Sequence, residues 1–345
     1  MKKAHLLAEV LHKVGLTRGL NVFWGRDRLT VLAYHRIIEW DTPEFRDYEP
    51  VVSATPAMFE QQMTFVAEHF NVIDLAALQA YLFDNKPLPE RPLLITFDDG
   101  YLDNYQNAYP VLKKHGFPAV IFLVTSRMDD PARLWWDVCG YAFRATRKNS
   151  AALPYIGQQP LASAAERRAA RELLMLHLKH IPDEQKQAEM QQLCAALDVS
   201  LPADERLFVT WDQVRELVAN GIACQPHTVT HPIMTRVSYD EQKRQLTEAR
   251  ARIIDETGQK ADAFAYPNGA PGDYDAATLR ALRETGYSTA FTLTSGPMSS
   301  SAARRHPLQI KRVYLGYRDS FEVFALKTMG LEAFIDRAPF VPGEH

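Results

Sequence analysis

Short apolar runs alternate along most of the chain with longer segments in which apolar residues recur at helical spacing. The runs are rich in Val, Ile, Leu and Phe and end in polar or turn-forming residues, as strands do. They predict strands at residues 29–35, 71–73, 93–97, 119–124, 223–227, 263–266, 289–293 and 309–313. Strands that alternate with helices indicate βα units around a parallel sheet, and seven to eight such units suit a (β/α) barrel. We therefore expect an α/β fold.

Cap residues mark where several of the helices should begin. Thr55 reads as an N-cap that is followed by proline at the first helical position. Asp74 has the same role ahead of the next helical segment. Ser238 and Glu241 have the spacing of a capping box, which predicts the start of a long helix. A further helix is expected over residues 104–115.

The alternation of strands and helices stops between residues 127 and 207. Residues 162–197 are rich in Ala, Glu, Arg, Lys, Gln and Leu, with Pro182 separating two helical stretches. We expect residues 127–207 to form a helical insertion at the end of a barrel strand, where it is either a wall over the substrate or simple packing bulk. Trp135 and Trp136 open this insertion, and they suit either core packing or stacking on a sugar ring.

The two ends of the chain are expected to lie outside the barrel, which should span residues 29–316. Residues 1–28 hold six Lys or Arg against two acidic residues, and their apolar residues recur at helical spacing. This segment is expected to be an amphipathic helix that docks on the barrel. Peripheral contact with anionic lipid is the alternative. Residues 317–345 are expected to form a helical tail.

Composition favours a soluble enzyme. The chain has 345 residues with 46% hydrophobic content, which is enough for one large domain with an insertion. Its net charge of −3 offers no overall basic field, so nucleic acid is not an expected partner. Cys139, Cys194 and Cys224 lack the spacing of a zinc ribbon or a disulfide framework. We expect no signal peptide and no membrane span, and therefore a cytoplasmic location, peripheral to the inner membrane if the N-terminal helix binds lipid. The sequence does not indicate an oligomeric state.

Two polar motifs follow predicted strands and contain residues suited to a metal site. Asp98 and Asp99 come directly after the strand at 93–97, and His227 and His231 stand at the end of a later strand. Each motif alone has an ordinary explanation, a turn for Asp-Asp-Gly and a surface or core pair for the histidines. Together they offer carboxylate and imidazole ligands at one edge of the sheet, which suits Zn²⁺ or a similar divalent ion.

These motifs resemble those of the polysaccharide deacetylases of carbohydrate esterase family 4, which contain the NodB homology domain. The resemblance covers about residues 29–315. It rests on Thr96-Phe97-Asp98-Asp99-Gly100-Tyr101 for the first motif, His227-Thr228-Val229-Thr230-His231-Pro232 for the second, and Phe264-Ala265-Tyr266-Pro267-Asn268-Gly269 for the third. The Tyr34-His35 pair is similar to the entry strand of a bacterial exopolysaccharide deacetylase branch. The resemblance implies a distorted (β/α) barrel.

Two positions depart from the family pattern. The third motif usually reads Phe-Arg-x-Pro-Tyr-Gly, so its Arg is replaced by Ala265 and its Tyr by Asn268. Leu308-Gln309-Ile310-Lys311 resembles the last motif, with Lys in place of the histidine that serves as the acid. The group that steadies the catalytic carboxylate must therefore come from elsewhere or be absent, and another residue must protonate the leaving amine.

The resemblance implies a metal-dependent carbohydrate N-deacetylase whose substrate is an N-acetylated polysaccharide, oligosaccharide or lipid-linked glycan. It assigns Asp99, His227 and His231 to the metal and Asp98 to the base that takes a proton from water. The backbone N–H of Asn268 matches the position that stabilises the oxyanion. Two alternatives remain open. The same metal site could hydrolyse an O-acetyl or another C–N bond, or the chain could be a carbohydrate-binding relative without activity.

His35 and Arg312 are our candidates for the two missing functions. His35 ends the first strand on the catalytic edge and is proposed to donate the proton to the leaving amine. A histidine that is merely buried beside the site is the alternative. Arg312 could replace the third-motif Arg and hold Asp98 ionised. Because successive strand residues point to opposite faces, only one of Lys311 and Arg312 can face the barrel interior. The alternative for Arg312 is a solvated position on the outer face.

Overall fold

The computed structural model describes residues 27–130, 132–203 and 205–331. Residues 1–26 of the predicted N-terminal segment and residues 332–345 of the predicted C-terminal tail lie outside these ranges. Among the described residues, no helix combines the length and the apolar character needed to cross a membrane.

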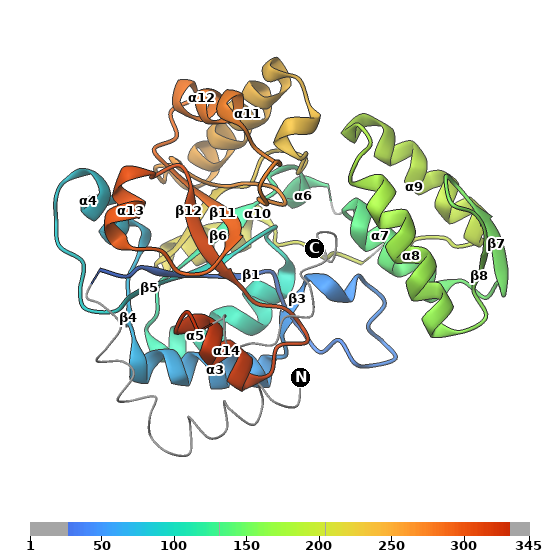
Figure 1. The fold of residues 1–345 in the computed structure, drawn as a ribbon, viewed down its shortest axis with the longest axis horizontal. Helices are drawn as coiled ribbons and strands as arrows, with labels where there is room; N and C mark the ends of the chain where they lie inside the picture. Colours follow the sequence, from blue (N-terminus) through green and yellow to red (C-terminus); the bar gives the residue numbers. More distant parts are fainter. Residues whose placement is uncertain (1–26, 131, 204, 332–345) are drawn as a thin grey trace.

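A mostly closed parallel sheet forms the centre of the molecule (Figure 1). Seven strands run in the order β10-β11-β12-β1-β5-β6-β9, and the short strand β4 pairs with β5. Their bounds are β1 (Thr30–Tyr34), β4 (Asn71–Val72), β5 (Pro92–Phe97), β6 (Ala119–Leu123), β9 (Ile222–Pro226), β10 (Ala263–Ala265), β11 (Thr289–Ser295) and β12 (Ile310–Tyr314). The predicted barrel of seven to eight strands is confirmed, and each predicted strand is present with ends that differ by one or two residues.

The barrel is distorted because its two end strands, β9 and β10, are joined through a side chain. The side-chain carbonyl of Gln225 in β9 accepts a hydrogen bond of 3.0 Å from the backbone N–H of Ala263 in β10. Its amide donates to the carbonyl of Lys260 at 2.9 Å. One buried glutamine thus satisfies backbone groups of the neighbouring segment at the point where the sheet does not close.

Strands at the centre of the sheet are buried on both faces. All residues of β1, β5 and β6 are buried, which explains their nearly unbroken apolar sequences. β1 and β5 pair in register, with Tyr34 opposite Phe97. His35 and Asp98 therefore leave the sheet at the same level, and the edge predicted to carry the site begins there.

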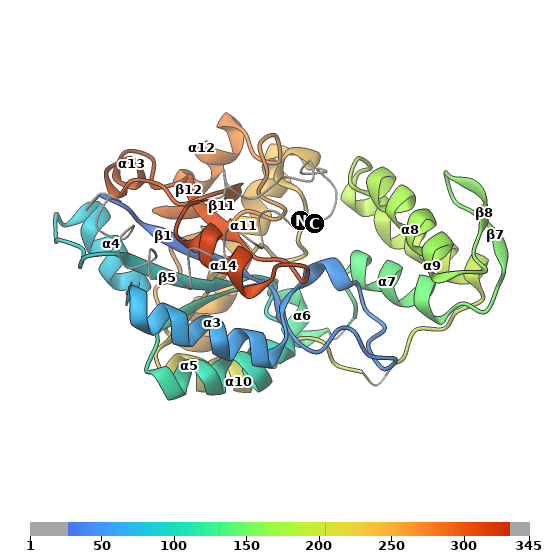
Figure 2. The same ribbon diagram turned by 60° about the horizontal axis from the view of Figure 1, so that its bottom comes forward.

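Helices surround the sheet and begin where their caps predict (Figure 2). The side chains of Thr55, Asp74 and Ser238 accept hydrogen bonds from backbone N–H groups of α3 (Pro56–His69), α4 (Leu75–Phe83) and α11 (Tyr239–Thr257). The Glu241 side chain accepts from Arg244 and Gln245, so the α11 cap is Ser238 alone. The helix expected over 104–115 is a π-helical turn, Asn104–Ala108, followed by α5 (Tyr109–His115). The remaining helices around the barrel are α6 (Ser126–Asp129), α10 (Trp211–Ala219), α12 (Ala276–Glu284), α13 (Ser300–Arg305) and α14 (Phe321–Thr328).

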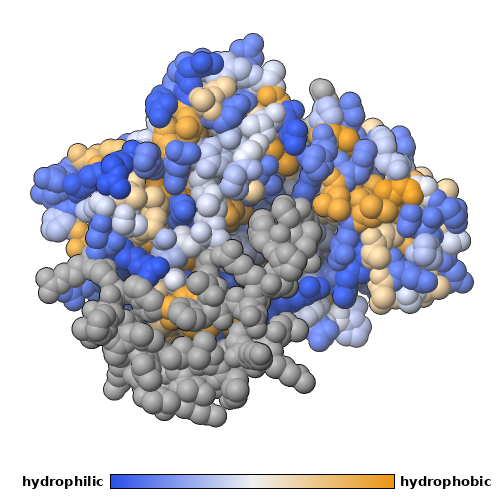
Figure 3. All heavy atoms as spheres, viewed as in Figure 1, coloured by the Kyte–Doolittle hydropathy of each residue, from blue (hydrophilic) through white to orange (hydrophobic). Residues whose placement is uncertain are grey.

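The insertion forms a lobe beside the barrel in both ribbon views (Figures 1 and 2). It contains α7 (Trp135–Ala145), α8 (Ala164–Leu178) and α9 (Asp183–Leu197). It also contains an antiparallel hairpin, β7 (Ser150–Leu153) and β8 (Gly157–Pro160). The prediction of a purely helical insertion was therefore wrong in this detail. One cluster of buried apolar side chains extends from β5 and β6 into α7, α8 and α9, and the lobe shares the barrel core. Its outer surface carries an apolar patch in Figure 3, and Leu173 and Leu176 of α8 are exposed.

The segment before β3 (Val52–Ala54) fastens the insertion to the barrel. This segment includes a 3-10 turn, Glu49–Val51. The backbone of Asp47 and Tyr48 passes so close to α7 that a Cβ on Gly140 would lie 2.4 Å from the Tyr48 nitrogen. No side chain fits at that position without moving the backbone.

We predict that Gly140→Ala destabilises the protein, although alanine favours helix by about 1 kcal/mol over glycine. Overpacking against backbone atoms typically costs about 1–3 kcal/mol, which outweighs that gain. Chemical or thermal unfolding measures the difference. Ala169→Gly, at an exposed position in α8, is the matched control and should show only the loss of about 1 kcal/mol in helix propensity. A Gly140→Ala variant more stable than the wild type would contradict the close contact.

Candidate metal centre and catalytic pocket

The carboxyl ends of three strands bring the predicted site residues together. Asp98 and Asp99 follow β5, His227 follows β9, and His35 follows β1. Asp99, at φ +72°, and Gly100, at φ +79°, turn the chain sharply at this edge. A Cβ on Gly100 would lie 2.6 Å from Cδ2 of Leu123, so glycine is required there for both conformation and space.

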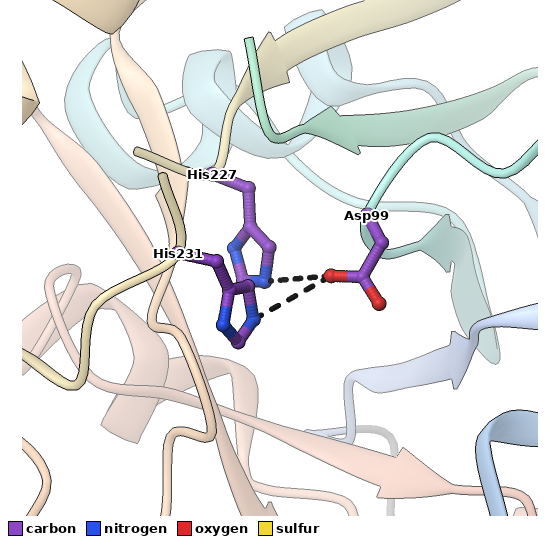
Figure 4. Close-up of side chains that lie close together, drawn as sticks. All are labelled: Asp99, His227 and His231. Atoms are coloured by element: carbon purple, nitrogen blue, oxygen red, sulfur yellow. Dashed lines mark ion pairs between the residues drawn. The ribbon is translucent and has the colours of Figure 1, made fainter. Parts of the chain in front are cut away.

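Asp99, His227 and His231 form a compact set of metal-ligand atoms (Figure 4). The Nε2 atoms of His227 and His231 each lie 3.5 Å from Oδ1 of Asp99. All three residues are buried, and the ligand atoms lie within 4.8 Å of one another. Oδ1 of Asp99 is buried and has no hydrogen-bond partner among the described residues. A buried carboxylate oxygen that faces two imidazole nitrogens fits a divalent ion.

The backbone fixes the orientation of both histidines. Nδ1 of His227 lies 2.7 Å from the carbonyl oxygen of Ala265 in β10. Because a carbonyl only accepts, Nδ1 carries the hydrogen and Nε2 keeps its lone pair for a ligand. The backbone N–H of His231 donates to Oγ1 of Thr228 at 2.9 Å. Thr228 and His231 have φ of +67° and +65°, and such left-handed residues persist where the surrounding structure holds them.

Burial and neighbouring charges shift the pKa values of Asp99 and His231. Burial, and then the charges of Asp98 and Asp137, raise the pKa of Asp99 well above its usual value. Burial, and then His227 and Lys186, lower the pKa of His231 well below its usual value. Burial disfavours the charged form of both side chains, and a bound cation would reverse the shift of the Asp99 pKa.

Asp98 is bound by Arg312 inside the barrel. Nη1 and Nη2 of Arg312 donate to Oδ1 and Oδ2 of Asp98, both at 2.7 Å, and both side chains are buried. Arg312 also donates to the Thr292 carbonyl and to Oγ1 of Thr96. Burial alone would raise the pKa of Asp98, but the charge and hydrogen bonds of Arg312, together with the nearby His227 and His35, outweigh burial and hold this pKa well below its usual value. Lys311 is the exposed residue of the two, so the alternative that Arg312 is solvated on the outer face is wrong.

His35 and Asn268 line the same small cavity, of about 40 Å³, as the metal-site residues. Nε2 of His35 lies 3.9 Å from Oδ2 of Asp98, and its buried Nδ1 has no hydrogen-bond partner among the described residues. Burial, only partly offset by Asp98, lowers the pKa of His35 to about 4. Asn268 has φ +61° and its side chain donates to Oδ2 of Asp273 at 2.6 Å.

The insertion supplies one wall of this cavity with Trp135, Trp136 and Lys179. The buried Trp136 ring packs edge-on against His231, with ring centroids 4.6 Å apart, so Trp136 is not an open sugar platform. Its Nε1 donates to the Tyr101 hydroxyl, which donates to Asp137, each at 2.8 Å. The adjacent tryptophans were visible in the sequence. Tyr101 stands in the first motif, but its hydrogen bond to Asp137 and the place of Lys179 beside the metal site had no signal, because they form only when the insertion folds back on the barrel.

Comparisons with known proteins agree with this geometry. The family model for polysaccharide deacetylase matches residues 85–290. Over 273 residues the chain is 22% identical to YxkH of Bacillus subtilis (strain 168), which is itself classed by inference as a polysaccharide deacetylase. This match covers 79% of this chain and 67% of that protein. It is 28% identical over 109 residues to the poly-beta-1,6-N-acetyl-D-glucosamine N-deacetylase of Escherichia coli (strain K12), a match that covers 32% of this chain and 16% of that one.

Solved structures share the fold at low sequence identity. Superposition on the Streptococcus pyogenes deacetylase PplD, solved in complex with acetate, gives a TM-score of 0.59 at 19% identity and covers 88% of this chain and 99% of that chain. Superposition on IcaB from Ammonifex degensii gives 0.56 at 20% identity, with coverage of 88% and 97%.

We predict that Asp99→Ala, His227→Ala and His231→Ala each lose bound metal. Removing a ligand should cost more than the roughly 10–100-fold in affinity that loss of an outer partner typically costs. Metal content per chain after dialysis, measured by elemental analysis, tests this. Asp98→Asn is the matched control and should retain metal, because Asp98 is not among the three residues whose ligand atoms converge. Retention of full metal content by His231→Ala, together with its loss from Asp98→Asn, would contradict the assignment.

Proposed function

The chain belongs to the polysaccharide deacetylase family, and we propose that it is a metal-dependent hydrolase that removes the acetyl group from an N-acetylated sugar. The substrate would be a polysaccharide, an oligosaccharide or a lipid-linked glycan. One observation carries this proposal. The residues suited to hold a metal share one pocket with a second carboxylate, Asp98, which Arg312 keeps ionised. A protein that only bound carbohydrate would need no such base.

Two adjacent carboxylates have different functions in this proposal. Asp99, with His227 and His231, would hold a divalent ion, Zn²⁺ by the nature of its ligands. Such an ion, when bound, supplies polarisation of the acetyl carbonyl and a lower pKa for the attacking water. Asp98 accepts the proton of that water, since its carboxylate is ionised and faces the same cavity. Arg312 fixes the orientation of Asp98 by binding both of its oxygens.

The remaining steps use the backbone of Asn268 and the ring of His35. The N–H of Asn268 is proposed to stabilise the oxyanion of the tetrahedral intermediate. The amine must leave protonated, and His35 is proposed to supply this proton. Because the lowered pKa of His35 keeps its ring neutral at rest, His35 must first receive a proton during the reaction. Asp98, 3.9 Å away, is its nearest source in this scheme.

Acetate release from N-acetylhexosamine oligomers tests the proposed reaction. The name of the Escherichia coli relative suggests a poly-N-acetylglucosamine as the first substrate. We expect one free amine for each acetate, which separates N-deacetylation from the loss of an O-acetyl group. Asp98→Asn should lower kcat by about 10²–10⁴-fold, the usual contribution of a general base. Near wild-type turnover in Asp98→Asn would remove Asp98 as the base.

Rate profiles against pH test the two compensating residues. Without Arg312, burial would raise the pKa of Asp98, and the base would be lost at a higher pH as the solution is acidified. The acidic limb of kcat for Arg312→Ala should therefore move to higher pH, and Arg312→Lys, which keeps the charge but not the fork, should move it less. Because His35 is already neutral above about pH 4, His35→Ala should lower kcat across the whole profile without moving either limb. An unchanged acidic limb in Arg312→Ala, or an unchanged kcat in His35→Ala, would exclude the corresponding role.

A further inference from the structure

A second cavity, of about 460 Å³, lies between the segment before β3, the end of α7 and the first half of α8. We call it the arginine pocket, because six arginines line it: Arg46, Arg144, Arg147, Arg167, Arg168 and Arg171. Glu49 is the single acidic residue among its lining residues. No sequence motif indicates this cluster, since its members come from three separate segments.

Glu49 neutralises only part of this charge. Arg171 donates to both of its carboxylate oxygens, at 2.6 and 3.0 Å, and Nη2 of Arg144 lies 3.1 Å from it. Arg46 and Arg147 have no hydrogen-bond or ion-pair partner within the described part of the chain. The buried Arg171 also has an unpartnered Nε there. Like charges that line one cavity repel each other, and a bound anion would relieve that repulsion.

The start of α8 also lines the pocket, although the Glu166 carboxylate of its capping box offsets part of its dipole. Ser163 caps this helix with a complete capping box, and Ala164 in its first turn lines the pocket. The helix dipole places partial positive charge at this end. Arg167, Arg168 and Arg171 project from the first two turns of the same helix. Backbone dipole and guanidinium groups therefore act on the same volume.

The arginine pocket and the metal site lie at opposite ends of the same two helices. Trp136 near the start of α7 and Lys179 just after α8 line the metal-site cavity. Arg144 near the end of α7 and Arg171 in the first half of α8 line the arginine pocket. Eight residues separate the members of each pair, which corresponds to about 12 Å along a helix. The two helices thus set the spacing between the sites.

We propose that the arginine pocket binds a phosphate or diphosphate group carried by the glycan substrate, at a separation from the deacetylated sugar that α7 and α8 set. This inference rests on the proposed function for the identity of the glycan but not for the anion site itself. Guanidinium forks match phosphate oxygens in pairs, and an excess of several positive charges suits a multiply charged anion better than a single carboxylate. With a net charge of −3 for the whole chain, this concentration of arginine is local and is not part of a general basic surface.

Calorimetric titration of the metal-loaded protein with inorganic diphosphate tests the anion site without any catalysis. We expect saturable binding, and at least about a tenfold loss of affinity in Arg46→Gln/Arg147→Gln, since this variant loses charge-assisted hydrogen bonds to the anion. Arg283→Gln/Arg305→Gln removes the same charge from exposed positions on the barrel and should bind as the wild type does. Absence of saturable binding, an equal loss in the control, or binding that is lost only in His227→Ala would overturn the anion site.

A second comparison tests whether the anion belongs to the substrate. N-acetylglucosamine oligomers with and without a phosphate at the reducing end are compared by acetate release. We expect the phosphorylated oligomer to have a KM at least about tenfold lower in the wild type, and Arg46→Gln/Arg147→Gln to remove this difference while kcat stays the same. Diphosphate binding with equal KM for both oligomers would overturn the link to the substrate. Diphosphate binding without acetate release from either would instead reject the proposed function and leave the anion site standing.

Discussion

The buried pair between Arg312 and Asp98 is the interaction on which the rest of the site depends. It joins β12 to the end of β5 across the barrel interior, and both side chains are almost fully excluded from solvent. A buried ion pair contributes little net stability against apolar residues of equal volume, whereas loss of one partner is costly. Its value here is functional. Asp98, Asp99 and Asp137 share one dry region, and without a dedicated cation these carboxylates would raise one another's pKa values. Arg312 keeps Asp98 ionised and leaves Asp99 free to bind a metal.

The barrel could be predicted from the sequence because its signals are local. Each strand is a short apolar run, and each of the caps at Thr55, Asp74 and Ser238 acts within one helical turn. The hairpin of β7 and β8 was missed since its eight strand residues include few apolar ones, and only alternate residues of β7 are buried. The junction between β9 and β10 was also invisible. It depends on one glutamine whose partners lie 35 and 38 residues away.

Some residues of the site could likewise be predicted from local sequence signals, and others could not. Asp98, Asp99, His227 and His231 stand in contiguous motifs at strand ends, so their proximity follows from the parallel sheet. Strand alternation predicted only that either Lys311 or Arg312 faces the barrel interior. The structure shows that Arg312 does. Trp136, Tyr101 and Asp137 form a hydrogen-bonded chain beside His231 that needs the insertion to fold back on the barrel. No local pattern specifies such a contact.

The insertion therefore does more than add bulk. Its helices wall the metal site with Trp135, Trp136 and Lys179 at one end and line the arginine pocket at the other. The segment from Glu49 to Val51 contributes to both cavities, with Glu49 at the arginine pocket and Val51 at the metal site. Close packing of Gly140 on Tyr48 prevents this segment and α7 from separating without a cost in core contacts. A ligand that engages both cavities must span a fixed distance, so the rigid attachment of the insertion would select substrates by length as well as by charge.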